Sequence, residues 1–109
     1  MAYSEELADR IRDVIGARSG VTERRMFGGV VWMIDGNMAV GTLGEDLMVR
    51  VGAQDTQRAL TEPHVGPMDF TGKPLKGFVR VAAEGIADGV QLAGWIDVGA
   101  DYATSLPPK

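Results

Sequence analysis

The fold is decided by the stretch Arg24-Arg25-Met26-Phe27-Gly28-Gly29, which leads directly into the apolar run Val30–Ile34 and the dipeptide Asp35-Gly36. Two consecutive glycines before a strand-like run indicate a backbone that needs a positive φ or a close approach by a neighbouring segment. Asp-Gly between two apolar segments is a strong signal for a two-residue hairpin turn. The block therefore predicts a basic, bulged entry into a β-hairpin that reverses at Asp35-Gly36.

Length and composition predict one globular domain over residues 1–109, with residues 4–104 ordered and residues 105–109 forming a tail. Apolar residues make up 45% of the chain and charged residues 24%, which is too hydrophobic for a disordered protein. The chain has no cysteine, so disulfides, thiolate metal ligands and cysteine nucleophiles are excluded. Its first residues are acidic, and no segment approaches the roughly 18 unbroken apolar residues of a membrane span. We therefore expect a cytoplasmic protein with no membrane partner.

Hydrophobic periodicity predicts an α+β fold, with helices and strands in the element order α-β-β-β-α-β-β-α. The expected elements are a helix capped by Ser4, strands at 29–34, 37–42 and 47–51, a short helix at 53–60, strands at 68–70 and 78–81, and a last helix that begins near Asp88. No strand is expected before residue 29.

The two-residue turn also predicts which side chains of the hairpin share a face. It sets the pairs Ile34–Asn37, Met33–Met38, Trp32–Ala39 and Val31–Val40. The face that carries Val31 and Met33 is uniformly apolar, and we expect it to pack under the helices. The opposite face carries Val30, Trp32 and Ile34 and is too apolar for free solvent. We predict that a second copy of the protein, forming a homodimer, or another protein partner covers it.

These residues resemble the TfoX/Sxy N-terminal domain family, in which a basic pair or Lys-Met precedes Phe-Gly-Gly. The resemblance extends to Asp35-Gly36, to the strand at 47–51, to Trp95 in the last helix and to Gly72-Lys73-Pro74-Leu75, where the family has Gly-Lys-Pro-Met. It covers the chain from about Ser4 to Ala103. The family-motif positions, which we expect to be structural, are Met26, Phe27, Asp35, Gly36, Gly72 and Pro74.

The resemblance implies a two-layer domain with an antiparallel sheet. Some members of the family are bacterial regulators of natural competence, which assist the expression of DNA-uptake genes together with another transcription factor. Those regulators carry a second, C-terminal domain, for which 109 residues leave no room. We therefore expect a single-domain member that acts as a non-enzymatic interaction or regulatory module.

The candidate binding residues are Arg24, Arg25, Gly28, Gly29, Trp32 and Lys73. Arginine forms bidentate pairs with phosphate or carboxylate, and consecutive glycines can present backbone amides to an anion. The simpler alternatives are solvated charges and a β-bulge or tight turn, and a turn set by proline also explains the Gly-Lys-Pro motif. The six methionines could form an adaptable binding surface, but for Met33 and Met38 we favour core packing.

No catalytic, metal or cofactor site is expected, because His64 is the only histidine and has no second ligand at metal-binding spacing. Two alternatives to the interaction module stay open. The first is a DNA-associated regulator with a basic surface formed by Arg24, Arg25, Lys73, Lys76 and Arg80. The net charge of −4 disfavours it, because phosphate contacts dominate nucleic-acid binding. The second is a small-molecule-binding protein or enzyme with a polar pocket near Arg25 or His64.

Overall fold

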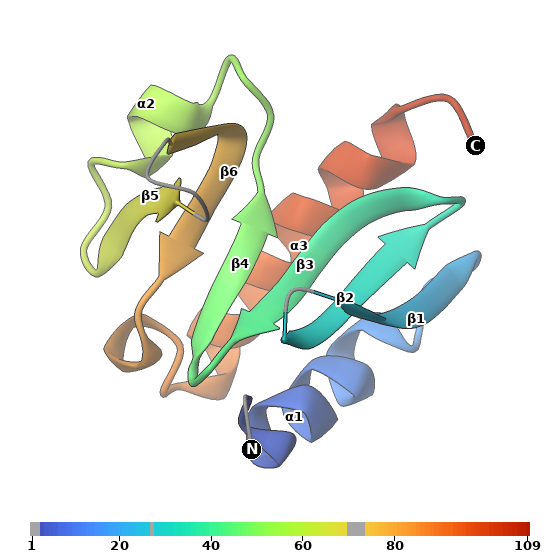
Figure 1. Ribbon diagram of the computed structural model, residues 1–109, viewed down its shortest axis with the longest axis horizontal. Coiled ribbons are helices and arrows are strands. Elements are labelled where there is room, and N and C mark those ends of the chain that lie inside the picture. The colour runs from blue at the N-terminus through green and yellow to red at the C-terminus, as the bar shows by residue number, and fades with distance from the viewer. Residues whose placement is uncertain (1–2, 27, 70–73) are drawn as a thin grey trace.

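The structure, a computed structural model, describes residues 3–26, 28–69 and 74–109. Within these residues six strands form one antiparallel sheet in the order β1-β2-β3-β4-β6-β5, and helices α1 and α3 lie against one of its faces (Figure 1). This is the α+β fold with an antiparallel sheet that the sequence predicts. None of the helices in the described part of the chain has the length and apolar character needed to cross a lipid bilayer.

Along the chain the elements are α1 (Glu5–Ile15), β1 (Val21–Met26), β2 (Gly29–Ile34), β3 (Asn37–Leu43), β4 (Asp46–Arg50), α2 (Thr56–Ala59), β5 (Val65–Asp69), β6 (Pro74–Val81), a 3-10 turn (Ala83–Gly85) and α3 (Gly89–Ser105). The observed order contains one strand more than the predicted order, namely β1. Its sequence Val-Thr-Glu-Arg-Arg-Met shows no apolar alternation, because β1 is an edge strand whose four central side chains are exposed. Charged side chains on an edge strand also oppose uncontrolled pairing with another sheet.

Both long helices begin at the residues that the sequence indicates. The Ser4 hydroxyl accepts a hydrogen bond from the backbone N–H of Leu7 at 3.1 Å, which caps α1. The Asp88 carboxylate accepts one from the backbone N–H of Val90 at 2.7 Å, which caps α3. Each cap satisfies a backbone donor that would otherwise have no partner in the first turn.

The hairpin turn between β2 and β3 has the predicted two-residue form. Asp35 and Gly36 both have a positive φ, 51° and 85°, as a turn of type I′ requires. The C-terminal residues, which we expected to be a tail, lie against this turn. The backbone N–H of Lys109 donates to the Asp35 carbonyl at 2.8 Å, and the Asn37 amide donates to the Pro107 carbonyl at 3.0 Å.

The hairpin departs from its predicted register beyond the second pair from the turn. Trp32 pairs with Val40 rather than with Ala39, so Ala39 is the extra residue of a β-bulge. A Cβ atom at Gly99 of α3 would lie only 2.4 Å from the Ala39 carbonyl oxygen. The backbone of α3 therefore packs directly on the bulge, and this close contact requires glycine at position 99.

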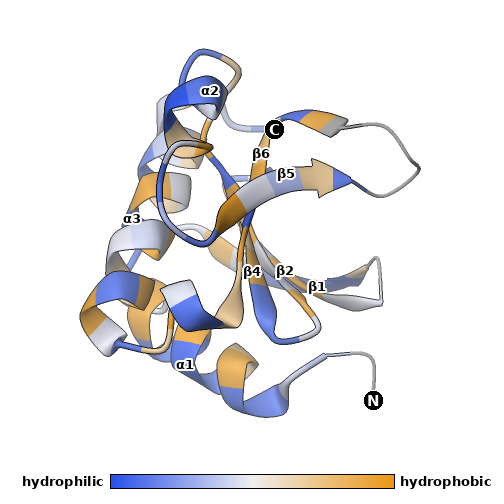
Figure 2. Ribbon diagram, turned by 90° about the vertical axis from the view of Figure 1, so that its left-hand side faces the viewer, coloured by the Kyte–Doolittle hydropathy of each residue, from blue (hydrophilic) through white to orange (hydrophobic). Residues whose placement is uncertain are grey.

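The predicted assignment of the two sheet faces is wrong. Val30, Trp32 and Ile34 are only 1–2% exposed and belong to the core that α1 and α3 complete. Val31 and Met33 lie on the other face, which carries no helix. Figure 2 shows the helices on one side of the sheet, while the hairpins β1–β2 and β5–β6 both reach away from them. The Val30/Trp32/Ile34 face is thus covered by the chain itself and is not available to a second copy or a partner.

Candidate functional site

The local backbone geometry requires glycine at both Gly28 and Gly29. Gly28 has a φ of 75°, in the left-handed region that favours glycine. A Cβ atom at Gly29 would lie 2.6 Å from both the carbonyl and the hydroxyl oxygen of Thr42. The Thr42 hydroxyl in turn accepts a hydrogen bond from the backbone N–H of Val30 at 2.9 Å. The pair therefore meets both predicted requirements, a positive φ and a close approach, and the N–H of Val30 already has a partner inside the chain.

Trp32, a predicted binding residue, is instead held in a charged network at the margin of the core. Its indole N–H donates to the Glu23 carboxylate at 3.1 Å, and the Arg12 guanidinium lies 5.9 Å from its ring centroid. Arg12 donates to both oxygens of Glu23, at 2.8 and 2.7 Å. These hydrogen bonds lower the pKa of Glu23 and raise that of Arg12, because they stabilise both charged forms. The network closes the edge of the core beside β1.

Arg24 and Arg25 lie on opposite faces of β1, because successive side chains of a strand alternate. The guanidinium of Arg25 lies 5.8 Å from the ring centroid of Tyr3, which packs against the helix-covered core. Arg24 is directly opposite Val31, whose side chain is on the helix-free face. The two arginines therefore do not form the single anion-binding edge that their adjacency in the sequence suggests.

The basic surface expected of a DNA-associated regulator is dispersed among the described residues. Arg24 is on β1, whereas Lys76 and Arg80 are on β6, four strand positions or about 19 Å away across the sheet. The Arg80 guanidinium also donates to Asp46 at 2.7 Å, which neutralises its charge locally. Lys73, together with Gly72 and Phe27, lies outside the described residues, and Pro74 is the first residue of β6.

The helix-free side of the sheet carries a concentrated apolar surface, which we call the methionine face. Its residues are Met26, Val31, Met33, Met38, Leu43, Met48, Met68 and Phe78. Five of the six methionines of the chain are among them, from β1, β2, β3, β4 and β5. An antiparallel sheet that exposes one face to water usually carries polar side chains there. The prediction that Met33 and Met38 pack under the helices is therefore corrected.

Burial on the methionine face falls from its centre to its rim. Val31, Met48 and Met68 are only 1–2% exposed, although no helix residue belongs to their cluster. Gly41 contributes to this packing, since the Met48 methyl carbon lies 3.0 Å from where a Cβ atom at position 41 would be. Met33 and Met38 are half-buried. The methionine face thus has a tightly packed centre and a rim of flexible, partly exposed thioether side chains. Side chains of this kind adapt to irregular partner surfaces.

Arg50, which we did not select from the sequence, borders the methionine face on β4. Its guanidinium lies 5.5 Å from the ring centroids of both Phe78 and Tyr102 and makes no ion pair in the described part of the chain. Aromatic contacts of this kind hold a guanidinium in place without neutralising it. The alternation of Leu47, Val49 and Val51 with Met48 and Arg50 was the available signal, since it assigns the last two to one face.

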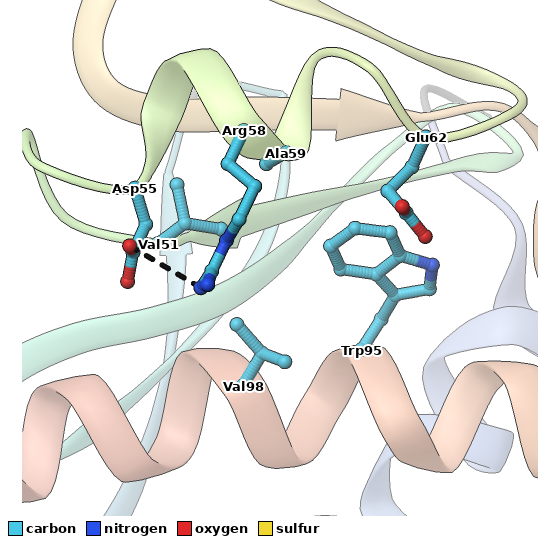
Figure 3. Close-up of a pocket in the computed structure, with 7 residues that line it drawn as sticks. All are labelled: Val51, Asp55, Arg58, Ala59, Glu62, Trp95 and Val98. Atoms are coloured by element: carbon cyan, nitrogen blue, oxygen red, sulfur yellow. Dashed lines mark ion pairs between the residues drawn. The ribbon is translucent and has the colours of Figure 1, made fainter.

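Two hollows outside the methionine face bear on the small-molecule alternative. A groove of about 200 Å³ lies between α2 and α3, and we call it the α2–α3 groove. It is lined by Val51, Asp55, Arg58, Ala59, Glu62, Trp95 and Val98 (Figure 3). A shallow depression of about 280 Å³ contains His64, Asp46 and Arg80. Both Asp46 oxygens are occupied there, one by Arg80 and one by the backbone N–H of Ala83, so Asp46 is already engaged and, among the described residues, no hydrogen bond joins it to His64.

Across residues 3–26, 28–69 and 74–109, no three His, Asp or Glu side chains are grouped closely enough to hold a metal ion.

Comparison with protein families gave a match to the TfoX N-terminal domain over residues 13–103. Comparisons with curated proteins and with solved structures gave no match. The matched segment contains the glycine pair, the Asp-Gly hairpin and the strands that form the methionine face. The chain therefore belongs to the TfoX N-terminal domain family.

Proposed function

We propose that this domain is a competence-regulator-like interaction module that binds a protein partner through the methionine face. The observation that carries the proposal is the concentration of five methionines on the one face of the sheet that α1 and α3 leave uncovered. Contiguous apolar surface of this kind marks interaction sites. Methionine-rich surfaces in particular can repack against different partners.

The unpaired arginines indicate what chemistry the partner presents. Arg12, Arg18 and Arg80 each form an ion pair with a carboxylate. Arg24 and Arg50, which belong to the methionine face or its border, form none within the described residues. A partner segment that combines apolar side chains with Asp or Glu would fill the methionine face and pair with both guanidinium groups. No catalytic residue is needed for this function.

Partner capture with matched variants tests the proposal. Wild type, Met33→Lys and Val90→Lys are used as baits in extract of the native cell, and captured proteins are quantified by mass spectrometry. Met33 is on the methionine face, whereas Val90 is an exposed apolar residue of α3 on the other side of the domain. The expected partner is retained by wild type and Val90→Lys and lost with Met33→Lys, because lysine places a charge in an apolar contact.

The purified partner then provides the direct measurement. We expect it to shift the methyl NMR signals of the labelled methionines on the methionine face, and Arg24→Glu to weaken its affinity about tenfold or more. Circular dichroism of each variant separates lost binding from lost folding. A partner that binds Met33→Lys as tightly as wild type, or that leaves the methionine methyl signals unchanged, contradicts the proposal.

A further inference from the structure

The outer side of α3 carries apolar side chains that the rest of the described chain leaves uncovered. Val90 is 82% exposed and Val98 is 42% exposed. Trp95 lies between them in the sequence, partly buried, and lines both the α2–α3 groove and the adjoining hollow beside Val90. The inner side of the same helix packs on the sheet through residues such as Leu92 and Ile96. A helix that is apolar on both sides is normally covered on both sides.

The α2–α3 groove continues this apolar surface and ends in charged groups of opposite sign. In Figure 3 the Arg58 side chain extends from α2 over Val98, and Glu62 lies beside Trp95 at the other end of the groove. Arg58 pairs with Asp55 at 3.2 Å, but its side chain is 80% exposed, so this pair is weak. Glu62 forms no ion pair within the described residues.

We propose that a second copy of this chain covers the outer side of α3 and the α2–α3 groove, in a two-fold symmetric dimer. A two-fold axis through the groove reverses the order of its ends, so Arg58 of each copy faces Glu62 of the other. The apolar residues Trp95 and Val98 then meet their own counterparts at the centre. A partner that carries one sign of charge would instead meet a like charge at one end of the groove.

This arrangement is independent of the proposed function. The helices and the methionine face lie on opposite sides of the sheet, so a dimer formed through α3 leaves both methionine faces open (Figure 2). The prediction of a homodimer is thereby retained as a proposal, but on a surface other than the buried Val30/Trp32/Ile34 face. Oligomeric state tests this proposal, whereas partner capture with methionine-face variants tests the function, so either can fail alone.

The first experiment measures molar mass by light scattering from micromolar to millimolar concentrations of the full chain. We expect wild type to rise toward twice the mass of one chain within this range. Val98→Lys should raise the dissociation constant about tenfold or more, because a charge enters the centre of the contact. Leu75→Lys is the matched control, because Leu75 is 39% exposed but lies outside the α2–α3 groove, and its dissociation constant should equal that of wild type.

A charge-reversal experiment tests the two-fold geometry. Arg58→Glu and Glu62→Arg should each weaken the dimer, because each places like charges opposite one another across the axis. The double variant restores opposite charges at both ends, and we expect it to recover most of the wild-type affinity. A wild type that stays monomeric throughout the range overturns the proposal and leaves the groove to a different protein partner. A double variant as weak as either single variant overturns the two-fold pairing.

Discussion

The two faces of the sheet are both apolar, yet they are built from different side chains. The helix-covered face uses Val, Ile, Leu and Trp, and these side chains are only 0–2% exposed across β2, β4 and β6. The methionine face has its unbranched thioether side chains on five strands, and those at its rim are half-buried. Branched side chains have few rotamers and pack in one arrangement, whereas methionine has three rotatable bonds and fills irregular space.

This difference indicates that the two faces of the sheet have different roles. The helix-covered face stabilises a single fold, because the buried side chains of the sheet and of α1, α2 and α3 form one packed cluster. The methionine face receives no such layer from the described chain and retains side chains that can rearrange. Two neighbouring charges of β1 differ in the same way, since Glu23 on the covered side forms an ion pair and Arg24 on the open side forms none within the described residues.

The largest expected effect comes from truncating adjacent residues that point to opposite faces. Ile34→Ala should lower the free energy of unfolding by about 2–5 kcal/mol, because it opens a cavity in a core that cannot collapse around it. Met33→Ala should lower it by only about 1 kcal/mol, since Met33 is half-buried and its neighbours can move into the space. Chemical denaturation of both variants measures the difference. Equal losses would mean that the methionine face is as rigidly packed as the covered one.

Local signals in the sequence predict much of the fold. The Asp35-Gly36 turn, the caps Ser4 and Asp88 and the positive φ of Gly28 depend on neighbouring residues only, and the structure contains all of them. The bulge at Ala39, in contrast, packs against Gly99, which lies sixty positions later in the sequence. The register of the hairpin therefore could not be predicted from the turn alone.

The assignment of faces failed for a related reason. Both sides of the β2–β3 hairpin are apolar, so alternation separates them without indicating which side the helices cover. The bulge shifts Val40 to the side of Trp32, and the helices cover that side. The candidate site changed with the assignment, because Trp32 is a core residue and Met33 and Met38 are half-buried residues of the methionine face. Arg24 retained its place in the candidate site, whereas Arg25 points to the covered side.

The contrast between covered and open surfaces extends to the two sides of α3. Gly99 faces the bulge, so Gly99→Ala should lower the free energy of unfolding by about 1–3 kcal/mol through overpacking. Gly94 has no atom within 4 Å of the position of an added Cβ, so Gly94→Ala should raise it by up to about 1 kcal/mol through helix propensity. Thermal and chemical denaturation at micromolar protein concentration compare the two. A stabilising Gly99→Ala would contradict the direct contact between α3 and β3.

The smallest effect concerns the paired and unpaired charges of β1. Hydrogen bonds from Arg12 lower the pKa of Glu23 in the folded protein, so the ion pair stabilises the fold above the ordinary glutamate pKa, and this stabilisation is lost as the pH falls through the lowered value. Glu23→Gln keeps an acceptor for Trp32 but removes the charge. Because Glu23 is 39% exposed, we expect wild type to exceed this variant by no more than about 1 kcal/mol at neutral pH.

Denaturation of wild type and Glu23→Gln between pH 7 and about pH 3 measures this difference, which should shrink toward zero at the acidic end, where both carry an uncharged side chain. In the Arg12→Gln background the pH-dependent part should be much smaller, because the main source of the pKa shift is gone. Arg24→Gln, on the adjacent residue, should change the free energy of unfolding by less than about 0.5 kcal/mol. If Arg24→Gln destabilised the protein as much as Glu23→Gln, the open side of β1 would contribute as much to the stability of the fold as the covered side does.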